Sequence, residues 1–381
     1  MRRLPVLCAA LVLVDTTLYA ALTPLLPHFL HEFGLSKSRA GSLVAAYAGG
    51  ALIGGIAGGV AASSFGPRRA VLFGLALMGA ASLAFGFAGD FWTLFAARLL
   101  QGLSGGFLWS GALPWLIAAT PRERRGQALG NAMGAAVFGA MFGPVLGAAA
   151  AIAGRATLFS ALAAVSIALA AWTLQFPPAP CEKMSLGALG RAVREHQFRT
   201  GFALMALGSL LFGILGVLAP LHLGRAGWGA AGIGAVWLVG AGLETAEAPL
   251  IGRLSDSRGP LVPARVALAA ALVVMLGLAT GARPLFYVPL IPLAALSFAP
   301  LFTAAFAMFA NGAEEVGLAQ GMGFGVMNAA WALGAIAGPA AGGAIAGATG
   351  DWIPFVIGAL FCAFALTILR PKAAKLATSG A

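Results

Sequence analysis

Long apolar segments, separated by short polar connections, follow one another along almost the whole chain of 381 residues. Each segment has roughly the 20 residues that an α-helix needs to cross the hydrocarbon core of a membrane. Twelve are predicted, at residues 4–28, 39–62, 69–88, 91–119, 128–150, 156–176, 199–221, 231–252, 262–280, 285–308, 322–346 and 352–370. The pattern therefore predicts an all-α membrane protein with 12 transmembrane helices.

The first segment opens with two arginines and an apolar run, as a signal peptide does. However, it continues past Asp15 to His28, and more apolar segments follow it. A secretory signal has a shorter apolar core and a cleavage site behind it. Residues 4–28 are therefore predicted to form a retained first helix.

A pattern of glycine and proline occurs twice, with the spacing G-x8-G-x3-GP-x2-G. The two copies are displaced by 195 residues: Gly130, Gly139, Gly143, Pro144 and Gly147, then Gly325, Gly334, Gly338, Pro339 and Gly342. A second repeat, displaced by 193 residues, pairs Gly59, Gly66 and Pro67 with Gly252, Gly259 and Pro260. The repeats predict two homologous six-helix bundles, at residues 1–178 and 199–381, joined by a cytoplasmic linker at residues 179–198.

Glycine at every fourth position leaves one face of a helix without side chains. In lipid, such a face allows the backbone of another helix to approach closely. The proline behind it removes a backbone donor and bends the helix. We expect the fifth and eleventh helices, which carry these glycines, to pack the two halves against each other.

The composition agrees with a membrane protein, because 60% of the residues are hydrophobic and only 9% are charged. Ordinary soluble domains do not have such a composition. The net charge of +11 would suit nucleic acid, but Lys and Arg lie almost entirely between the apolar segments. Seventeen of them lie on one predicted side of the membrane and five on the other, which places both termini in the cytoplasm. We therefore predict a lipid bilayer, and no nucleic acid, as the partner.

The three cysteines are far apart and lack the spacing of a metal or redox site, so we predict neither metal nor cofactor. Within the linker, Leu186, Leu189 and Val193 have the spacing of an apolar stripe. They predict a short helix that lies in the membrane interface.

Four motifs carry a resemblance to a known family. They are GRLSDSRG at Gly252–Gly259, RLLQG at Arg98–Gly102, the two glycine–proline helices, and VDTTLYAALTPLLP at Val14–Pro27. Together they resemble the major facilitator superfamily, and within it the twelve-helix drug:proton antiporter branch. The first-half copy of the loop motif departs from the family pattern, since Ser63 and Ser64 stand where an Asp-Arg pair is usual.

The resemblance implies transport by alternating access between two halves. It also implies that Asp256 accepts hydrogen bonds that hold one conformation, with a weakened contact or none in the first half. In the drug:proton antiporter branch that the chain resembles, an acidic residue at the position of Asp15 is associated with cationic substrates.

Only four strongly charged residues lie well inside the predicted helices: Asp15, Arg98, Glu244 and Glu247. Each costs roughly 2.5–3.5 kcal/mol at the centre of a membrane helix, so each needs a watery cavity, a partner or a proton. Glu244 and Glu247 share one helix face, and one of the two is expected to hold its proton. The alternative is that they reach the cytoplasmic surface or bind Arg253.

Asp15 lies roughly 16 Å along the first helix, at 1.5 Å per residue, which is near mid-membrane. It could hold a proton, a cationic substrate, or each in turn. A static pair with Arg98 is the alternative. Arg98 and Gln101 lie on one face of the fourth helix, where they can modify a nearby acid or serve packing alone.

Aromatic residues in the predicted helices could line a cavity for lipophilic cations. The candidates are Tyr19, Tyr47, Trp109, Phe138, Trp237 and Trp331. For each residue alone, packing or lipid contact is the competing explanation.

These features predict a monomeric secondary active transporter that exports small amphipathic or cationic compounds in exchange for protons. The proton gradient supplies the driving force, and a bacterial inner membrane is the expected location. The alternatives are an exporter or symporter of a sugar or another metabolite and, more remotely, a membrane sensor or a membrane enzyme. An enzyme would need a convergent catalytic site, and we find no HExxH or GxSxG pattern that predicts one.

Overall fold

The computed structural model describes residues 3–369 except 122–123, 179–185, 282 and 318–319. Its described residues form α-helices joined by short connections. In chain order these are α1 (Leu4–Ala20), the short 3-10 helix η1 (Thr23–Leu25), α2 (Leu26–Phe33), α3 (Lys37–Phe65), α4 (Pro67–Gly86), α5 (Phe91–Ala119), α6 (Arg125–Ala153), α7 (Arg155–Thr173), α8 (Leu186–Ala192), α9 (His196–Arg225), α10 (Ala230–Arg258), α11 (Leu261–Ala279), α12 (Pro284–Tyr287), α13 (Leu290–Glu315), α14 (Gln320–Ala348) and α15 (Trp352–Ile368).

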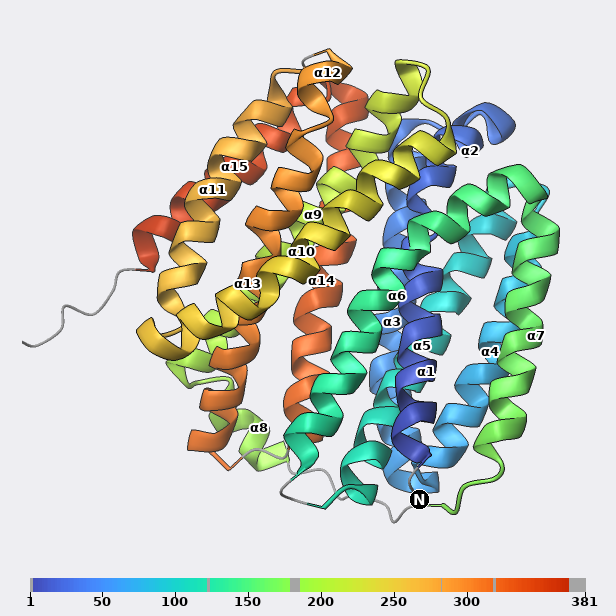
Figure 1. Cartoon of the computed structure of the whole chain (residues 1–381), viewed down its shortest axis with the longest axis vertical. Helices are drawn as coiled ribbons and strands as arrows, with labels where there is room; N and C mark the ends of the chain where they lie inside the picture. Colours follow the sequence, from blue (N-terminus) through green and yellow to red (C-terminus); the bar gives the residue numbers. More distant parts are fainter. Residues whose placement is uncertain (1–2, 122–123, 179–185, 282, 318–319, 370–381) are drawn as a thin grey trace, which may run out of the picture.

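These helices match the predicted segments closely, and the all-α membrane fold is confirmed. Among the described residues, nine helices are long and apolar enough to cross a membrane. Helix α15 is a shorter apolar helix of 17 residues. Helices α5 and α10 have 29 residues each and carry the charged residues Arg98, Glu244 and Glu247. Helix α5 runs with the first half of the chain and α10 with the second (Figure 1). With these two helices and α15 the predicted set of twelve is complete.

The first predicted segment is broken rather than continuous. Helix α1 ends at Ala20, η1 follows, and α2 begins at Leu26. Pro24 and Pro27 lie in this stretch and lack the backbone N–H that a continuous helix would use. The break leaves the last carbonyls of α1 without α-helical partners.

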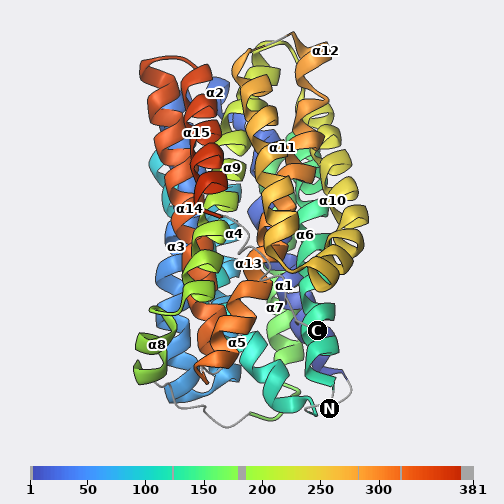
Figure 2. The ribbon, with the colours of Figure 1, turned by 90° about the vertical axis from the view of Figure 1, so that its left-hand side faces the viewer.

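The two halves of the chain lie side by side. Helices α1 to α7 form one group and α9 to α15 the other, with α10 crossing obliquely in front of its group (Figure 1). Seen from the side, the long helices run roughly along one axis (Figure 2). The predicted linker helix is present as α8, at the same end of the molecule as the N-terminus (Figure 1).

The boundaries of the linker at residues 178 and 198 stay a prediction. Residues 179–185 lie outside the described residues, and so do the side chains of Leu186 and Leu189 in the predicted apolar stripe. Val193, the third member of that stripe, is exposed.

Equivalent glycines end equivalent helices in the two halves. Gly66, after α3, has φ +92° and Gly259, after α10, has φ +81°. Residues with a Cβ atom rarely adopt such positive φ values. The two turns lie 193 residues apart, as the sequence repeat predicts.

The glycine ridges pack helices within each half. A Cβ atom added at Gly139 of α6 would collide with a backbone carbonyl oxygen of α1, one at Gly143 with Ala20 of α1, and one at Gly147 with the carbonyl oxygen just after the end of α1. In the second half, Gly334 and Gly338 of α14 have the same relation to carbonyl oxygens of α9. The contact at Gly342 is looser, because a Cβ atom added there would lie 3.3 Å from the side chain of Ile214 of α9. The fifth and eleventh helices do lie between the halves, as expected, but these glycines face helices of their own half.

Contacts between the halves use other faces of the same helices. A Cβ atom at Gly41 of α3 would collide with the carbonyl oxygen of Pro339 of α14. One at Gly234 of α10 would lie 3.0 Å from the carbonyl oxygen of Pro144 of α6. Sequence periodicity shows which residues share a helix face, but not which neighbouring helix that face meets.

Candidate functional site

The carboxylate of Asp15 is buried at the centre of the first half. Only 2% of its surface is exposed. The Tyr47 hydroxyl of α3 donates a hydrogen bond to Oδ1 at 2.7 Å, and the Trp109 indole N–H of α5 donates one to Oδ2 at 2.8 Å. Three helices, α1, α3 and α5, thus meet at this carboxylate, and both of its hydrogen-bond donors are uncharged.

Gly105 of α5 provides the space for this arrangement. A Cβ atom added at Gly105 would lie 2.5 Å from Oδ1 of Asp15 and 2.7 Å from the Tyr47 hydroxyl. Any side chain there would push the two hydrogen-bonded groups apart. Gly105 is not predicted from the sequence, because glycine is so common in this chain that no single one stands out.

The buried Arg98 side chain binds the broken end of α1. Its guanidinium donates hydrogen bonds to the carbonyl oxygens of Leu18, at 3.0 Å, and Tyr19, and to Oε1 of Gln101, at 3.0 Å. These carbonyls belong to the last turn of α1, where a positive charge is favourable. Arg98 therefore stabilises the break in the first helix.

Arg98 and Asp15 are not among the ion pairs of the described residues. Instead, the ring of Tyr47 contacts both. Its hydroxyl binds Asp15, and the Arg98 guanidinium carbon lies 4.9 Å from its ring centroid. The alternative of a static Asp15–Arg98 pair is thus not seen in this structure.

Four predicted aromatic residues gather at this carboxylate, and we call them the aromatic cluster: Tyr19, Tyr47, Trp109 and Trp331. The ring of Tyr19 lies 4.9 Å from that of Tyr47 and 5.4 Å from that of Trp331, centroid to centroid. Trp331 comes from α14 of the second half. The cluster therefore lies where the two halves meet.

Glu244 and Glu247 lie elsewhere, in a crevice of about 330 Å³ between α6, α10 and α13. Aromatic and aliphatic side chains form most of its lining, among them Phe138, Met141 and Phe302. Oε1 of Glu247 is buried without a hydrogen-bond partner among the described residues. We refer to this space as the glutamate crevice.

The remaining predicted site residues lie neither at the Asp15 carboxylate nor in the glutamate crevice. Trp237 packs, half-buried, against the hydrophobic core. Gly252 faces open space, and Gly259 ends α10. The side chain of Asp256 lies outside those that the structure describes, so its predicted hydrogen bonds stay a prediction.

A polar cluster that the sequence does not predict joins the halves at the end opposite to α8. Lys37 of α3 contacts Oδ1 of Asp351 at 2.5 Å, and Arg225 of α9 contacts Oδ2. Burial alone would raise the pKa of Asp351, but the hydrogen bonds and charges of Lys37 and Arg225 hold it below its ordinary value. Lys37 thus links the first half to the second.

The family of the chain follows from comparing its sequence with profiles of known protein families. The sequence profile described as Major Facilitator Superfamily matches residues 7–324, well over half of the chain. The chain belongs to the major facilitator superfamily. It is therefore a membrane transporter by family, and members of this superfamily act on small-molecule substrates.

Individual relatives of this major facilitator protein are more distant. The quinolone resistance protein NorA of Staphylococcus aureus (strain MRSA252) is 29% identical over 107 residues, which cover 28% of each chain. The MFS-type transporter ppzB of Metarhizium rileyi is 29% identical over 121 residues, 30% of this chain and 25% of ppzB. The chain thus matches less than a third of the length of either relative.

Solved structures share the fold along the full length. The xylose transporter XylE from E. coli has a TM-score of 0.75 at 12% identity and covers 96% of both chains. A bacterial homologue of the human lysosomal transporter Spinster has a TM-score of 0.76 at 14% identity, over 97% of this chain and 96% of that one. At such identities the likeness shows the fold alone.

Proposed function

We propose that this major facilitator transporter exports small amphipathic cations from the cytoplasm in exchange for protons. The observation that carries the proposal is the environment of Asp15: a buried carboxylate whose hydrogen-bond donors, Tyr47 and Trp109, are both uncharged. A charge so deep in the membrane needs a counter-charge or a proton. The two donors stabilise the carboxylate without neutralising it.

A proton and a cation are then alternative ways to neutralise the same group. A cation that arrives at Asp15 favours the ionised carboxylate and releases the proton; a proton that binds there releases the cation. This competition couples the two movements in opposite directions. Exchange rather than co-transport follows, because the two ligands exclude each other.

The aromatic cluster favours organic cations over metal ions. Ring faces attract cations, and they bind apolar substituents as well. The guanidinium of Arg98 already occupies such a position, 4.9 Å from the Tyr47 centroid. An amphipathic cation would find the same rings beside a carboxylate.

The glutamate crevice adds a second place with the same chemistry. Its lining combines two carboxylates with Phe138, Phe302 and Phe306. We assign it an accessory role, in which it concentrates cations near α6 before they reach Asp15. The quinolone resistance protein NorA, which matches 28% of the chain, supports export of a small compound and says nothing of its charge.

The test measures proton movement in everted membrane vesicles that contain the protein, with a pH-sensitive dye. A panel of lipophilic cations and neutral solutes of matched size is added to wild type, Asp15→Asn, Glu244→Gln/Glu247→Gln and Glu314→Gln. Glu314 is exposed at the end of α13 and controls for loss of one negative charge.

We expect cations to release protons in wild type and Glu314→Gln. In Asp15→Asn the response should fall to that of vesicles without the protein. Cation-triggered release that survives in Asp15→Asn would contradict the proposal. A response to neutral solutes alone would instead indicate a sugar or metabolite transporter.

A further inference from the structure

Helices α3 and α14 bring the two halves into contact at the end of the molecule opposite to α8. A Cβ atom added at Gly343 of α14 would lie 2.5 Å from the carbonyl oxygen of Lys37 of α3. Beside this contact, Nζ of Lys37 lies 2.5 Å from Oδ1 of Asp351 and 3.5 Å from the carbonyl oxygen of Ala346. Backbone packing and one ion pair therefore hold the halves together at this end.

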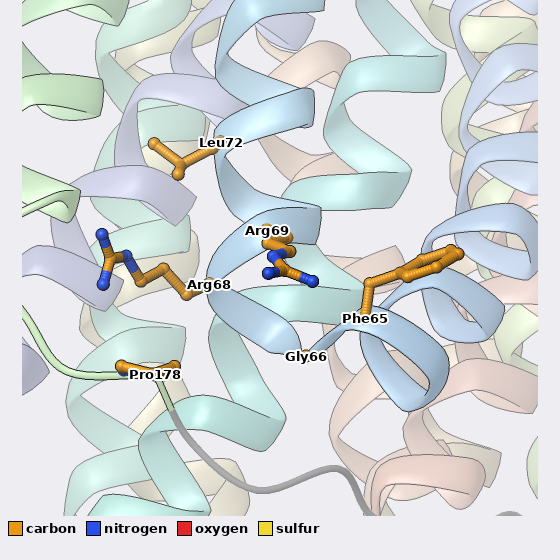
Figure 3. Close-up of a pocket in the computed structure, with 6 residues that line it drawn as sticks. All are labelled: Phe65, Gly66, Arg68, Arg69, Leu72 and Pro178. Atoms are coloured by element: carbon orange, nitrogen blue, oxygen red, sulfur yellow. The ribbon is translucent and has the colours of Figure 1, made fainter.

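The two ends of the molecule differ in this respect. Of the four ion pairs among the described residues, only the one between Lys37 and Asp351 joins the halves. At the opposite end, a pocket of about 390 Å³ is lined by residues of the first half, and its two arginines, Arg68 and Arg69, point to different sides of the Gly66 turn (Figure 3). An ion pair between the halves at one end favours the conformation in which that end is closed.

The carboxylate of Asp351 is shared by one cation from each half. Lys37 of the first half contacts Oδ1, and Arg225 of the second half contacts Oδ2. The side chains of Lys37 and Asp351 are 26% and 22% exposed, whereas that of Arg225 is 51% exposed, so solvent screens the pair between the halves less. Arg225 and Asp351 belong to the same half, and they therefore stay together when Lys37 moves away with the first half.

The charges of these three groups predict what it costs to open this end. Two cations on one carboxylate attract the carboxylate and repel each other. Separation of the halves removes the attraction between Lys37 and Asp351, but it also removes the repulsion between Lys37 and Arg225. Arg225 therefore offsets part of the cost of opening. It also continues to neutralise Asp351 afterwards, so that no partly buried carboxylate is left without a partner.

We propose that Lys37 and Asp351 form a latch that holds this end of the transporter closed, and that Arg225 lowers the free energy needed to release it. The two cations then act in opposite directions on one conformational equilibrium: Lys37 favours the closed end and Arg225 the open end. The proposal rests on transport by movement of the two halves against each other. It is independent of the substrate and of proton exchange at Asp15.

The experiment measures the distance across this end by double electron–electron resonance, with the full-length protein in lipid nanodiscs and no substrate. Spin labels are attached at Gly89→Cys in the first half and Gly229→Cys in the second, after the native cysteines are replaced by alanine. A Cβ atom at either glycine meets no atom within 4 Å, so a label can be accommodated. The longer distance reports the open end and the shorter distance the closed end.

Four substitutions are compared with wild type in this labelled background. Lys37→Gln removes the cation of the latch, and Arg225→Gln removes the same charge from the other side of the carboxylate. Asp351→Asn removes the carboxylate itself. The matched control is Arg283→Gln, which removes an exposed charge next to α12 at the same end of the molecule. Thermal unfolding shows that each variant is folded.

We expect the ratio of open to closed populations to rise about 2- to 5-fold in Lys37→Gln and to fall by a similar factor in Arg225→Gln, the range of partly exposed ion pairs. Asp351→Asn should raise the ratio most, because only the repulsion between the two cations then remains. Arg283→Gln should match wild type. Shifts of Lys37→Gln and Arg225→Gln in the same direction, or an unchanged ratio in Lys37→Gln, would overturn the proposal.

Discussion

Helices α3 and α10 hold equivalent places in the two halves but differ in what they pack against. In α3, small residues close the contact with α5: a Cβ atom at Gly54 would collide with the carbonyl oxygen of Leu103. The equivalent position in α10, 193 residues later, is Glu247, which lines the crevice of about 330 Å³ between α6, α10 and α13. Ala51 and Glu244 form the second such pair.

The difference shows how one architecture can carry two kinds of carboxylate. Because α3 closes tightly on α5, Asp15 is enclosed and receives two hydrogen bonds. Because Glu244 and Glu247 line the crevice between α6, α10 and α13, they have space in front of them, and Oε1 of Glu247 has no hydrogen-bond partner among the described residues. An enclosed, hydrogen-bonded acid suits selective exchange, and an open pair suits loose attraction of cations.

The largest effect should come from Gly54→Ala. The added methyl group meets backbone rather than a flexible side chain, so α3 and α5 must separate. Overpacking of this kind costs roughly 1–3 kcal/mol. Thermal unfolding in detergent should show a clear loss for Gly54→Ala and little change for Gly59→Ala, which faces open space on the same helix. Equal stability of the two variants would contradict the tight α3–α5 contact.

Next in size should be Gly105→Ala. Its methyl group would displace Asp15 from Tyr47, and a hydrogen bond to a charged group is worth about 1.5–3 kcal/mol. We expect at least about tenfold slower cation-triggered proton release. Gly216→Ala on α9, which also faces open space, is the matched control. Wild-type release rates in Gly105→Ala would show that the Asp15–Tyr47 bond is dispensable.

A smaller effect is expected from Glu244→Gln/Glu247→Gln. Partly exposed charge pairs contribute about 0.2–1 kcal/mol, so the cation concentration for half-maximal release should rise roughly 2- to 5-fold. The maximal rate and the unfolding temperature should stay near wild type. A loss of maximal rate as large as that of Asp15→Asn would remove the distinction between the two acidic sites.

The smallest effect concerns Asp351, a carboxylate with two cationic partners, and appears only in acid. Its pKa is held below the ordinary value of 3.8 by Lys37 and Arg225. The stabilisation is therefore complete above that value and is lost as the pH falls below it. Unfolding temperatures of wild type and Asp351→Asn should differ slightly between pH 5 and 7, and the difference should shrink as the pH falls below 3.8. A difference that does not shrink in this acid range would contradict the linkage.

The sequence predicts the helices and the repeat well, because apolar length and glycine spacing are local properties. It also predicts Asp15 and the aromatic residues, since a mid-membrane charge is costly wherever it lies. Contacts between helices could not be predicted in this way. Arg98 binds carbonyls of α1 because that helix breaks, and Lys37 meets Asp351 over 314 positions of the chain.

The direction in which the glycine ridges face is the other feature that periodicity leaves open. Since Gly139 faces α1 and Gly334 faces α9, these helices pack closely within each half. In the proposed cycle, rearrangement takes place between the halves, at the α3–α14 and α6–α10 contacts, where Gly41 and Gly234 bring backbone against backbone. One proton crossing 100 mV releases about 2.3 kcal/mol. In the proposed exchange, so small a driving free energy can turn this carrier over only if no packed core is taken apart in each cycle.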